Sequence, residues 1–586
     1  MAAVHTEAPS IFGGILVNEA EDKIQYVKYR PSQPYDSNTP IPFKIPGNTN
    51  QYVSLHDSYL YIKCHVEHTD EYGKHKKSSK GAVLSSHMTS TGTTGSISRR
   101  HVEDHYGDDD TDEEEDPRAN GKRTTRDTLQ NPPPKRTRTT TSTSNTMATS
   151  DDEEEEDVKI YNVYTADQIA KLEFEAITRH QTAVESMEEA VAKIGTPEYE
   201  SRMTYALGVQ DVSDMANRQY MQALMSNRIA QTPNPALLPI DNVMHSMWNG
   251  VDIFMNGELV STTNQKYMYK AYMETILNNS HSTKQFQLKS SGFYGDSGDR
   301  DKHFFITKNM GMMERKLKYD NENKVEMMGF LLSDIMGIQA SIVNGVEIEI
   351  ILTPNLDNIR LQGFGKNQYG RMIIDDIVLF VCKRTFSKEV LLAHASLMEH
   401  EPAIYPFKKT EVRAYNGNSG NTQVVIENPY ESKIPTRFIL GMIDADAYIG
   451  NWEKNPLNFQ HYNISKAAFY IDDETIAKPP YYLNPTRGQF LEPLMELYKI
   501  LGKAGEDQDI GISPEDYISG LFLLPFDVTP TSAANMEYLS KQKGGNCRIE
   551  LQFRQPLPNN IIILAYAIFP QELRIDMARN CASVPV

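Results

Sequence analysis

Runs of alternating apolar and polar residues recur along the chain and predict half-buried β-strands. The run Arg548–Arg554 (RIELQFR) places three apolar side chains on one face and four polar ones on the other. Because strand side chains alternate with a period of two, this run predicts a strand with one solvated face. The run Ile561–Phe569 is apolar almost throughout, which predicts a strand covered on both faces.

The two halves of the chain repeat one order of predicted elements. Similar strings, GFLLSDI at Gly329–Ile335 and GLFLLPFDV at Gly520–Val528, each predict a strand. An alternating strand and then an apolar strand follow each string: Val346–Leu352 and Met372–Val381 in the first half, Arg548–Arg554 and Ile561–Phe569 in the second. The repeat of about 190 residues is too long for a solenoid unit and matches a whole β domain. We therefore expect two copies of one antiparallel sandwich.

Each half also holds a tight hairpin followed by a helix. Asn256 and Gly257 separate two strand-like runs, and this pair supplies the positive φ angles of a type I′ turn. Asp472 and Asp473 occupy the same place in the second half. The helices predicted from the sequence are Tyr267–Leu277, Glu492–Leu501 and, between the halves, Lys388–His400.

A long polar segment interrupts the first half. Strand-like runs at Ile24–Tyr29 and Ser58–Val66 precede it, and residues 67–157 are then rich in Ser and Thr with blocks of like charge. Such a segment buries too little apolar surface to offset the entropy of ordering, so we expect it to be disordered. Apolar residues at helical spacing follow a capping box at Thr165, and Asp214–Ile229 is also predicted to be helical.

These patterns predict an all-β protein of two antiparallel sandwiches, with a disordered and helical insertion in the first sandwich. The predicted segments are an N-terminal arm with the first strands (1–66), a disordered charged insert (67–157), a helical insert (158–241), the remainder of the first sandwich (242–387), a linking helix (388–400) and the second sandwich with a C-terminal tail (401–586).

Charge and cysteine usage narrow the class of protein. Net charge is −19, but Glu103–Asp157 alone holds 18 acidic and 7 basic residues, so the remainder is only mildly acidic. An acidic balance argues against a surface that coats nucleic acid. The four cysteines form no CxxC pair, which favours reduced core or tail residues over a zinc site. The sequence shows no secretory signal and no apolar run of membrane-spanning length, so we expect assembly in the nucleus or cytoplasm.

The sequence nominates no catalytic, cofactor-binding or metal-binding residues. Gly363–Gly370 is rich in glycine but lacks the Lys-Ser/Thr of a P-loop, so we interpret it as a surface loop. Asp444 and Asp446 lack the later Glu and the Gly of a calcium loop. Trp248 and Trp452 lie beside strand-like runs and are interpreted as core or interface anchors.

Two basic clusters in the charged insert form a candidate nuclear import signal. The six residues are Lys122, Arg123, Arg126, Lys135, Arg136 and Arg138. The alternative interpretation is that these side chains only balance the neighbouring acidic runs in a solvated loop. The acidic runs themselves either bind basic partners or keep the loop extended.

Several segments, in a shared order, resemble the major capsid protein of Polinton (Maverick) elements and adintoviruses. The resemblance is carried by Asn242–Leu277 (NVMHSMWNGVDIFMNGELVSTTNQKYMYKAYMETIL), Leu440–Asp473, Gly520–Thr529 and Ile549–Phe569 (IELQFRQPLPNNIIILAYAIF), with a weaker match at Ser58–Val66. It implies that the two sandwiches are jelly rolls, so that the fold is an all-β double jelly roll. It also implies a homotrimer that forms a pseudo-hexagonal capsomer, contacts neighbouring capsomers and penton or minor capsid proteins, and tiles an icosahedral virion. It implies no catalytic residue and no specific nucleic-acid binding. The long insert departs from the family.

Three other functions remain open on sequence grounds. A penton-type minor capsid protein needs only one sandwich. A glycan-binding or carbohydrate-active sandwich needs paired carboxylates or an aromatic platform, and the sequence nominates neither. A histone-chaperone-like protein would use the acidic blocks. The sequence also leaves open whether a membrane lies beneath the shell.

Overall fold

The computed structural model describes the chain in several ranges that belong to one compact unit. These ranges are residues 21–69, 236–304, 309–365, 368–475, 479–507, 509–529 and 541–586, with scattered helical positions between Gln168 and Ser186. The described positions of that stretch agree with a predicted helix there. The predicted disordered insert beyond Thr69, the Thr165 capping residue, the Asp214–Ile229 helix and all six candidate import residues lie outside the described ranges.

The first sandwich consists of two four-stranded antiparallel sheets. One has the order β1-β10-β3-β7 and the other β2-β8-β5-β6. Their bounds are β1 Glu21–Tyr29, β2 Ile41–Ile45, β3 Tyr52–Thr69, β5 Trp248–Met255, β6 Glu258–Ser261, β7 Val325–Gly329, β8 Ile348–Pro354 and β10 Tyr369–Phe386; the short pair β4 Ala236–Pro239 and β9 Leu361–Phe364 is separate. Residues 70–235 therefore intervene between β3 and β4.

The second sandwich repeats this arrangement. Its main sheets have the orders β11-β21-β14-β18 and β12-β20-β15-β16. Their bounds are β11 Ala403–Gly417, β12 Gln423–Glu427, β14 Arg437–Asp444, β15 Ile464–Ile471, β16 Glu474–Thr475, β18 Leu523–Asp527, β20 Cys547–Phe553 and β21 Ile561–Ile575, with accessory strands β13 Lys433–Ile434, β17 Tyr481–Tyr482, β19 Lys543–Gly544 and β22 Cys581–Pro585.

Strand order identifies both sandwiches as jelly rolls. When the eight main strands of either half are lettered B to I along the chain, the two sheets have the orders B-I-D-G and C-H-E-F in both halves. Paired sheets of this topology define the eight-stranded jelly roll. The fold predicted from the sequence, a double jelly roll, is therefore confirmed. Below, the two sheets of each jelly roll are called its BIDG sheet and its CHEF sheet.

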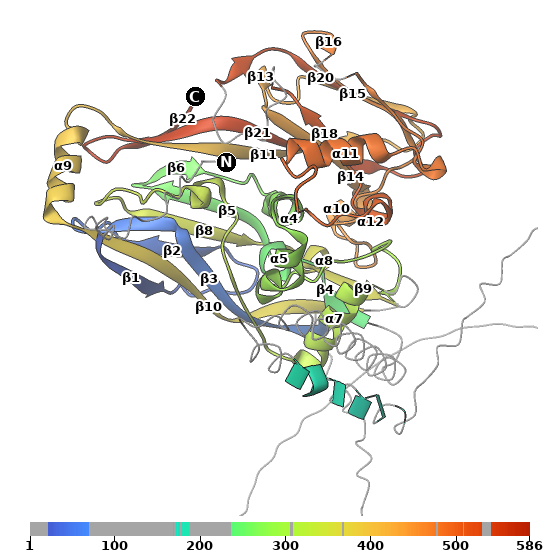
Figure 1. Ribbon diagram of the computed structural model, residues 1–586, viewed down its shortest axis with the longest axis horizontal. Coiled ribbons are helices and arrows are strands. Elements are labelled where there is room, and N and C mark those ends of the chain that lie inside the picture. The colour runs from blue at the N-terminus through green and yellow to red at the C-terminus, as the bar shows by residue number, and fades with distance from the viewer. Residues whose placement is uncertain are drawn as a thin grey trace, which may run out of the picture. The chain divides into compact units, whose positions relative to one another are not determined.

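Helices lie in the connections between strands. The α-helices are α3 Val243–Ser246, α4 Tyr267–Asn278, α5 His281–Gln285, α7 Met310–Lys318, α8 Asp357–Arg360, α9 Lys388–Met398, α10 Ala445–Ile449, α11 Leu491–Ile500 and α12 Pro514–Gly520; the 3₁₀ turns are η1 Gln287–Ser291, η2 Asp320–Glu322, η3 Asp334–Gly337 and η4 Pro485–Arg487. Helices α4 and α11 each follow the hairpin between strands E and F, and α9 links the two jelly rolls (Figure 1). None of the described helices combines the length and apolar character needed to cross a bilayer.

Most strand and turn predictions agree with the structure. In β20, Ile549, Leu551 and Phe553 are buried and the intervening polar residues are partly exposed, as alternation predicts. In β21 every residue from Ile561 to Gln571 is buried. The turns at Asn256-Gly257 and Asp472-Asp473 have positive φ at both positions, as type I′ requires.

One predicted strand is wrong. Gly329–Ile335 was expected to be a strand, but β7 ends at Gly329 and Asp334 begins the 3₁₀ turn η3. The second string does contain a strand, β18. The two strings therefore occupy different places in the two jelly rolls, and the true repeat is the strand order. Strand β4 also lies within the range assigned to the helical insert.

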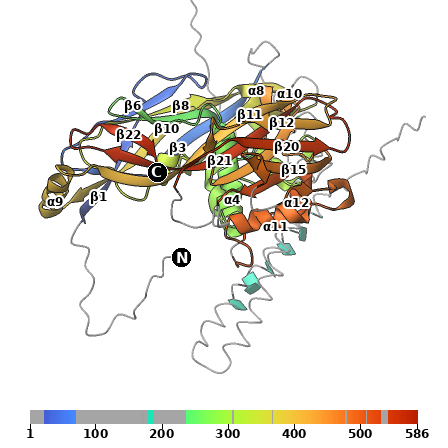
Figure 2. The same cartoon turned by 90° about the horizontal axis from the view of Figure 1, so that it is seen from above.

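Strands β11 and β21 contribute to both hydrophobic cores. Val412 and Leu564 belong to the core of the second jelly roll, whereas Phe407 and Leu573 pack with the core of the first. Figures 1 and 2 show these long strands extending beyond the second sandwich, over the first one. Since a core residue contributes through the apolar surface that it buries, the two jelly rolls stabilise each other through these strands.

Candidate functional site at the junction between the two jelly rolls

Helix α4 is buried on all sides because it packs between the two jelly rolls. Tyr267 and Ala271, one turn apart, belong to the core of the first jelly roll. The core of the second includes six further α4 residues: Met268, Tyr269, Tyr272, Met273, Ile276 and Leu277. A helix that is apolar on every side is typical of a fully buried position. Helix α4 is therefore a component of both cores.

Two clusters of buried polar residues lie at the junction, and the first is centred on Lys270 in the middle of α4. Lys270 Nζ lies 2.7 Å from Glu274 Oε1 and 3.2 Å from Asp334 Oδ1, and it donates to the carbonyl of Leu332 at 2.8 Å. Burial opposes the charge of Lys270, but the two carboxylates outweigh burial and raise the pKa of the ammonium above its ordinary value.

The same carboxylates bind the second jelly roll. The backbone N–H of Thr410 on β11 donates to Asp334 Oδ2 at 3.1 Å, and the hydroxyl of Tyr566 on β21 lies 3.5 Å from Glu274 Oε1. The outer face of the second BIDG sheet is thus the face that α4 covers. The cluster links the position of α4 to the position of that sheet.

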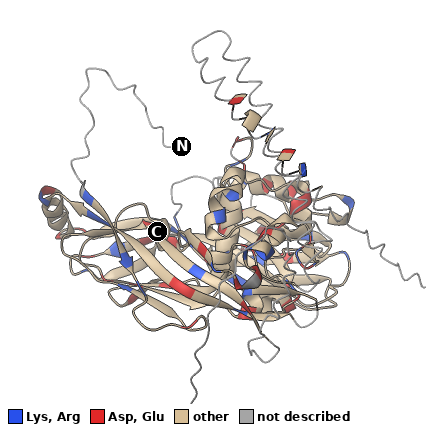
Figure 3. Ribbon diagram, turned by 90° about the horizontal axis from the view of Figure 1, so that it is seen from below, with Lys and Arg blue, Asp and Glu red and all other residues tan. Residues whose placement is uncertain are grey.

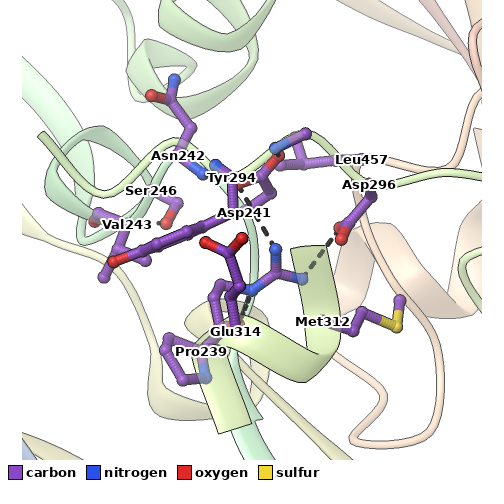
Figure 4. Close-up of polar contacts among 12 residues, drawn as sticks. Pro239, Asp241, Asn242, Val243, Ser246, Tyr294, Asp296, Met312, Glu314 and Leu457 are labelled. Atoms are coloured by element: carbon purple, nitrogen blue, oxygen red, sulfur yellow. Dashed lines mark hydrogen bonds and ion pairs between the residues drawn. The ribbon is translucent and has the colours of Figure 1, made fainter. Parts of the chain in front are cut away.

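A buried arginine in α7 forms the second polar cluster (Figure 4). Arg315 donates from Nη2 to Asp296 Oδ2 at 2.9 Å and from Nε to the carbonyl of Pro239 at 2.8 Å, and its Nη1 lies 3.4 Å from Asp241 Oδ1. The side chains of Arg315, Asp241 and Asp296 are at most 1% exposed. Asp241 also accepts the backbone N–H groups of Tyr294 and Gly295. The cluster fixes the loop that follows η1.

That loop makes polar contacts across the junction. Arg300 donates to the carbonyl of Leu457, which lies in the second jelly roll, and its guanidinium lies 5.6 Å from the centre of the Tyr272 ring. Asp301 accepts from the backbone N–H of Asn455 at 2.7 Å and from the amide of Asn458 at 2.9 Å. Because leaving a buried charged group without its hydrogen-bond partner is costly, these contacts favour one orientation of the two jelly rolls.

His245 beside α4 is buried and neutral. Burial, with a smaller contribution from Lys270, lowers the pKa of His245 to about 3. The hydroxyl of Tyr267 accepts the backbone N–H of Leu332 at 3.0 Å and lies 2.9 Å from His245 Nδ1. Tyr267 and His245 therefore share a buried hydrogen bond, whose direction depends on the tautomer of the neutral imidazole.

The outer face of the first BIDG sheet carries what we call the aromatic strip: Tyr26, Tyr59, Phe330 and Phe380. The Tyr59 ring lies 5.7 Å from Tyr26, 6.5 Å from Phe330 and 4.8 Å from Phe380, measured between ring centres. Tyr26 is 49% exposed and Phe330 is 53% exposed. Exposed apolar patches of this kind commonly mark contact surfaces.

Helix α11 carries a second exposed apolar surface. Its buried face, which includes Leu494 and Leu497, packs in the core of the second jelly roll. Leu491 and Met495, one turn apart on the other face, are each 53% exposed. We call this pair the α11 stripe. Helix α4, the counterpart of α11, has both of its faces covered, so the α11 stripe is the uncovered equivalent of the α4 surface that contacts the second jelly roll.

Outside these clusters, positively and negatively charged residues are interspersed. Figure 3 shows Lys or Arg and Asp or Glu interspersed along the strands on the side that it views. Within the described ranges, no three or more His, Cys, Asp or Glu residues are grouped to hold a metal ion. Asp444 and Asp446 both pair with Lys454, whose Nζ lies 2.8 Å and 3.0 Å from their carboxylates.

The other residues singled out in the sequence occupy structural positions. Trp248 is fully buried in the first core, and Trp452 packs against the same core. Gly363 lies in β9, where its backbone N–H donates to the carbonyl of Trp452 at 2.7 Å, so this part of the glycine-rich segment is a strand and not a surface loop. All four cysteines are free and buried.

Sequence reasoning missed the junction residues. Lys270 is the single basic residue of α4, whereas Arg315 is one of three basic residues in α7. The partner Asp334 or Asp241 is in each case more than 60 residues away. The one available signal was Lys270 itself, a charged residue in an otherwise largely apolar helix.

Comparison with known proteins gives distant likenesses. No protein-family model matches the chain. The uncharacterized protein F54H12.2 of Caenorhabditis elegans is 22% identical over 369 residues, which cover 60% of this chain and 84% of that protein. The fold is therefore assigned from the strand order of this chain and not from these likenesses.

Three solved structures illustrate the structural likeness. The structure of the Sputnik virophage has a TM-score of 0.47 at 9% identity and covers 98% of this chain and 90% of its own. The mavirus major capsid protein has a TM-score of 0.41 at 7% identity, with 98% and 92% covered. The Faustovirus major capsid protein has a TM-score of 0.42 at 8% identity, with 96% and 93% covered.

Proposed function

We propose that the protein is a structural major capsid protein that trimerises into pseudo-hexagonal capsomers of an icosahedral shell. The observation that carries this proposal is the internal junction, in which α4 of one jelly roll covers the outer face of the next BIDG sheet. The chain also holds both halves of a second junction of the same kind, the aromatic strip and the α11 stripe, and leaves them uncovered.

A second copy of the chain supplies the missing contact. The α11 stripe of one copy would pack on the aromatic strip of the next copy, as α4 packs on β11 and β21 within one copy. Such a contact joins two different surfaces, and head-to-tail contacts of this type generate closed rings when the rotation closes. Six jelly rolls related by similar contacts require three copies, which gives the pseudo-hexagonal outline.

Single substitutions at the two surfaces test this arrangement. Phe330→Asp and Met495→Asp each place a charge in one half of the proposed contact, so each purified variant is expected to be monomeric in light scattering while the wild type is trimeric. Leu356→Asp is the matched control, because Leu356 is 62% exposed but belongs to neither surface. Thermal unfolding checks that all three variants remain folded.

Mixing the two monomeric variants gives a sharper result. The Phe330→Asp chain retains its α11 stripe and the Met495→Asp chain retains its aromatic strip, so one sound contact forms between them. We expect a heterodimer at high concentration and no closed trimer. A wild-type chain that stays monomeric across salt and pH, or trimers that persist in both variants, would contradict the proposed assembly.

The lineage and location of the protein follow from the sequence resemblance. We infer a major capsid protein of the Polinton and adintovirus type, located in the virion. Electron microscopy of the expressed chain should show capsomers or shells.

The basic clusters of the insert are proposed as the nuclear import signal. Replacing all six by alanine should move a fluorescently labelled chain from the nucleus to the cytoplasm. An unchanged distribution would favour the charge-balancing role.

A further inference from the structure

A pocket of about 620 Å³ lies beside the linking helix α9. Its wall includes Tyr52, Phe386, Leu397, Met398 and Tyr405, together with His394, whose Nδ1 lies 2.9 Å from the Tyr52 hydroxyl. The volume falls within the range typical of ligand pockets, which are mostly apolar with a few polar groups. At its rim Leu397 is 65% exposed.

The first strand begins beside this pocket. Glu21, the first residue of β1, pairs with Phe386, the last residue of β10 and part of the pocket wall. Because β1 and β10 are antiparallel, β1 begins beside the end of β10, two residues before α9 begins at Lys388. The chain therefore enters the fold next to an apolar pocket.

The N-terminal segment has the composition that such a pocket accepts. Residues 11–17 read IFGGILV, with five apolar residues and two glycines. An extended chain covers about 3.3 Å per residue, so Val17 lies within about 13 Å of Glu21. A segment tethered this closely has a high effective concentration at the pocket, which favours it over an untethered partner.

We propose that the α9 pocket is the docking site of the chain's own N-terminal segment, Ile11–Val17. The apolar side chains of the segment would cover Leu397 and Met398 and fix α9 against the first jelly roll. Docking would tie the N-terminus to the helix that links the two jelly rolls.

Crosslinking in the full-length chain tests the proposal. Leu16→Cys combined with Leu397→Cys should be joined by a short bismaleimide, as detected by mass spectrometry of the linked peptides. Leu16→Cys with Leu392→Cys is the matched control, because Leu392 is 72% exposed on the same helix but does not line the pocket. We expect at least a tenfold higher yield for the first pair. The wild type, with its four buried cysteines, gives the background.

Two further measurements test whether the segment docks through its apolar side chains and within one chain. Adding Ile15→Asp and Val17→Asp to the first pair should reduce the crosslink about tenfold and increase hydrogen exchange in residues 388–405. Equal yields for the two cysteine pairs, or no response to the added charges in a chain that remains folded, would overturn it. So would a crosslink formed only between two copies, which a mixture of isotope-labelled and unlabelled chains reveals.

Discussion

Lys270 and Arg315 are single residues whose surroundings decide how the two jelly rolls meet. Each is a cation with an almost fully buried side chain, and each lies within 3.4 Å of two carboxylates. A buried ion pair adds little net stability compared with a well-packed apolar group, but removing one partner leaves an uncompensated charge. The junction therefore tolerates loss of a whole cluster better than loss of one member.

Substitution of Arg315 by methionine should be strongly destabilising. Arg315→Met leaves Asp241 and Asp296 buried without their cation, so we expect the free energy of unfolding to fall by about 3–5 kcal/mol. Urea denaturation measures this. The triple variant Arg315→Met/Asp241→Asn/Asp296→Asn should recover much of the loss. Lys63→Met, which removes a more exposed ion pair, should cost no more than about 1 kcal/mol.

His245 should make the protein sensitive to mild acid. Its folded-state pKa of about 3 lies below the value near 6.5 of an unfolded histidine. Its contribution to stability is thus complete above pH 6.5 and is lost as the pH falls from 6.5 toward 3. At pH 5 the loss is about 2 kcal/mol, from about 1.4 kcal/mol per pH unit.

The variant His245→Gln isolates this effect. Between pH 7 and pH 5 its free energy of unfolding should fall by about 2 kcal/mol less than that of the wild type. His400→Gln is the control, because His400 is exposed. An identical pH dependence in wild type and His245→Gln would show that other groups cause the acid sensitivity.

At the scale of elements, the sequence predicts the strands and turns whose pattern depends only on neighbouring residues. The alternation in Arg548–Arg554 and the Asn256-Gly257 turn each require only neighbouring residues, and both are present in the structure. Strand β7 was missed because it is short and Met328, on its outer face, is 41% exposed. The strand was predicted instead at the adjacent apolar string Gly329–Ile335, although Phe330 in that string lies on the surface.

The site required information that no local pattern contains. The α4 pattern predicts a helix, and its excess of apolar residues predicts burial. Which of its faces meets which jelly roll depends on the packing of β11 and β21, more than 120 residues later. The aromatic strip likewise combines residues of β1, β3 and β10 with the segment after β7.

The hairpin turn offers a test of an element that the sequence predicts well. Gly257 has φ of +85° and open space around its missing side chain, so Gly257→Ala meets backbone strain without a clash. We expect a loss of about 1 kcal/mol in the free energy of unfolding. Gly337→Ala is the matched control, since that glycine also has open space but no positive φ. Equal costs at the two positions would contradict this interpretation.

At the scale of the whole molecule, the insert and the jelly rolls are separable in the chain. All described strands of both jelly rolls lie outside residues 80–162. Replacing residues 80–157 by a short Gly-Ser linker should therefore leave trimer formation intact, as measured by light scattering. Loss of trimers would show that the insert takes part in assembly. A histone-chaperone role predicts instead that histone binding disappears with the acidic blocks.

The central position of β21 also has a consequence for synthesis on the ribosome. This strand lies between β11 and β14, so the second BIDG sheet stays open until residues 561–575 have been made. The first jelly roll acquires its own central strand, β10, nearly 200 residues earlier and can fold while translation continues. A chain truncated before Ile561 would thus contain all eight strands of the first jelly roll, but it would lack the β21 residues that complete its core and the surface on which α4 packs. Incomplete translation products would be left with exposed apolar surface that chaperones and proteases recognise, and would be removed before they reach a shell.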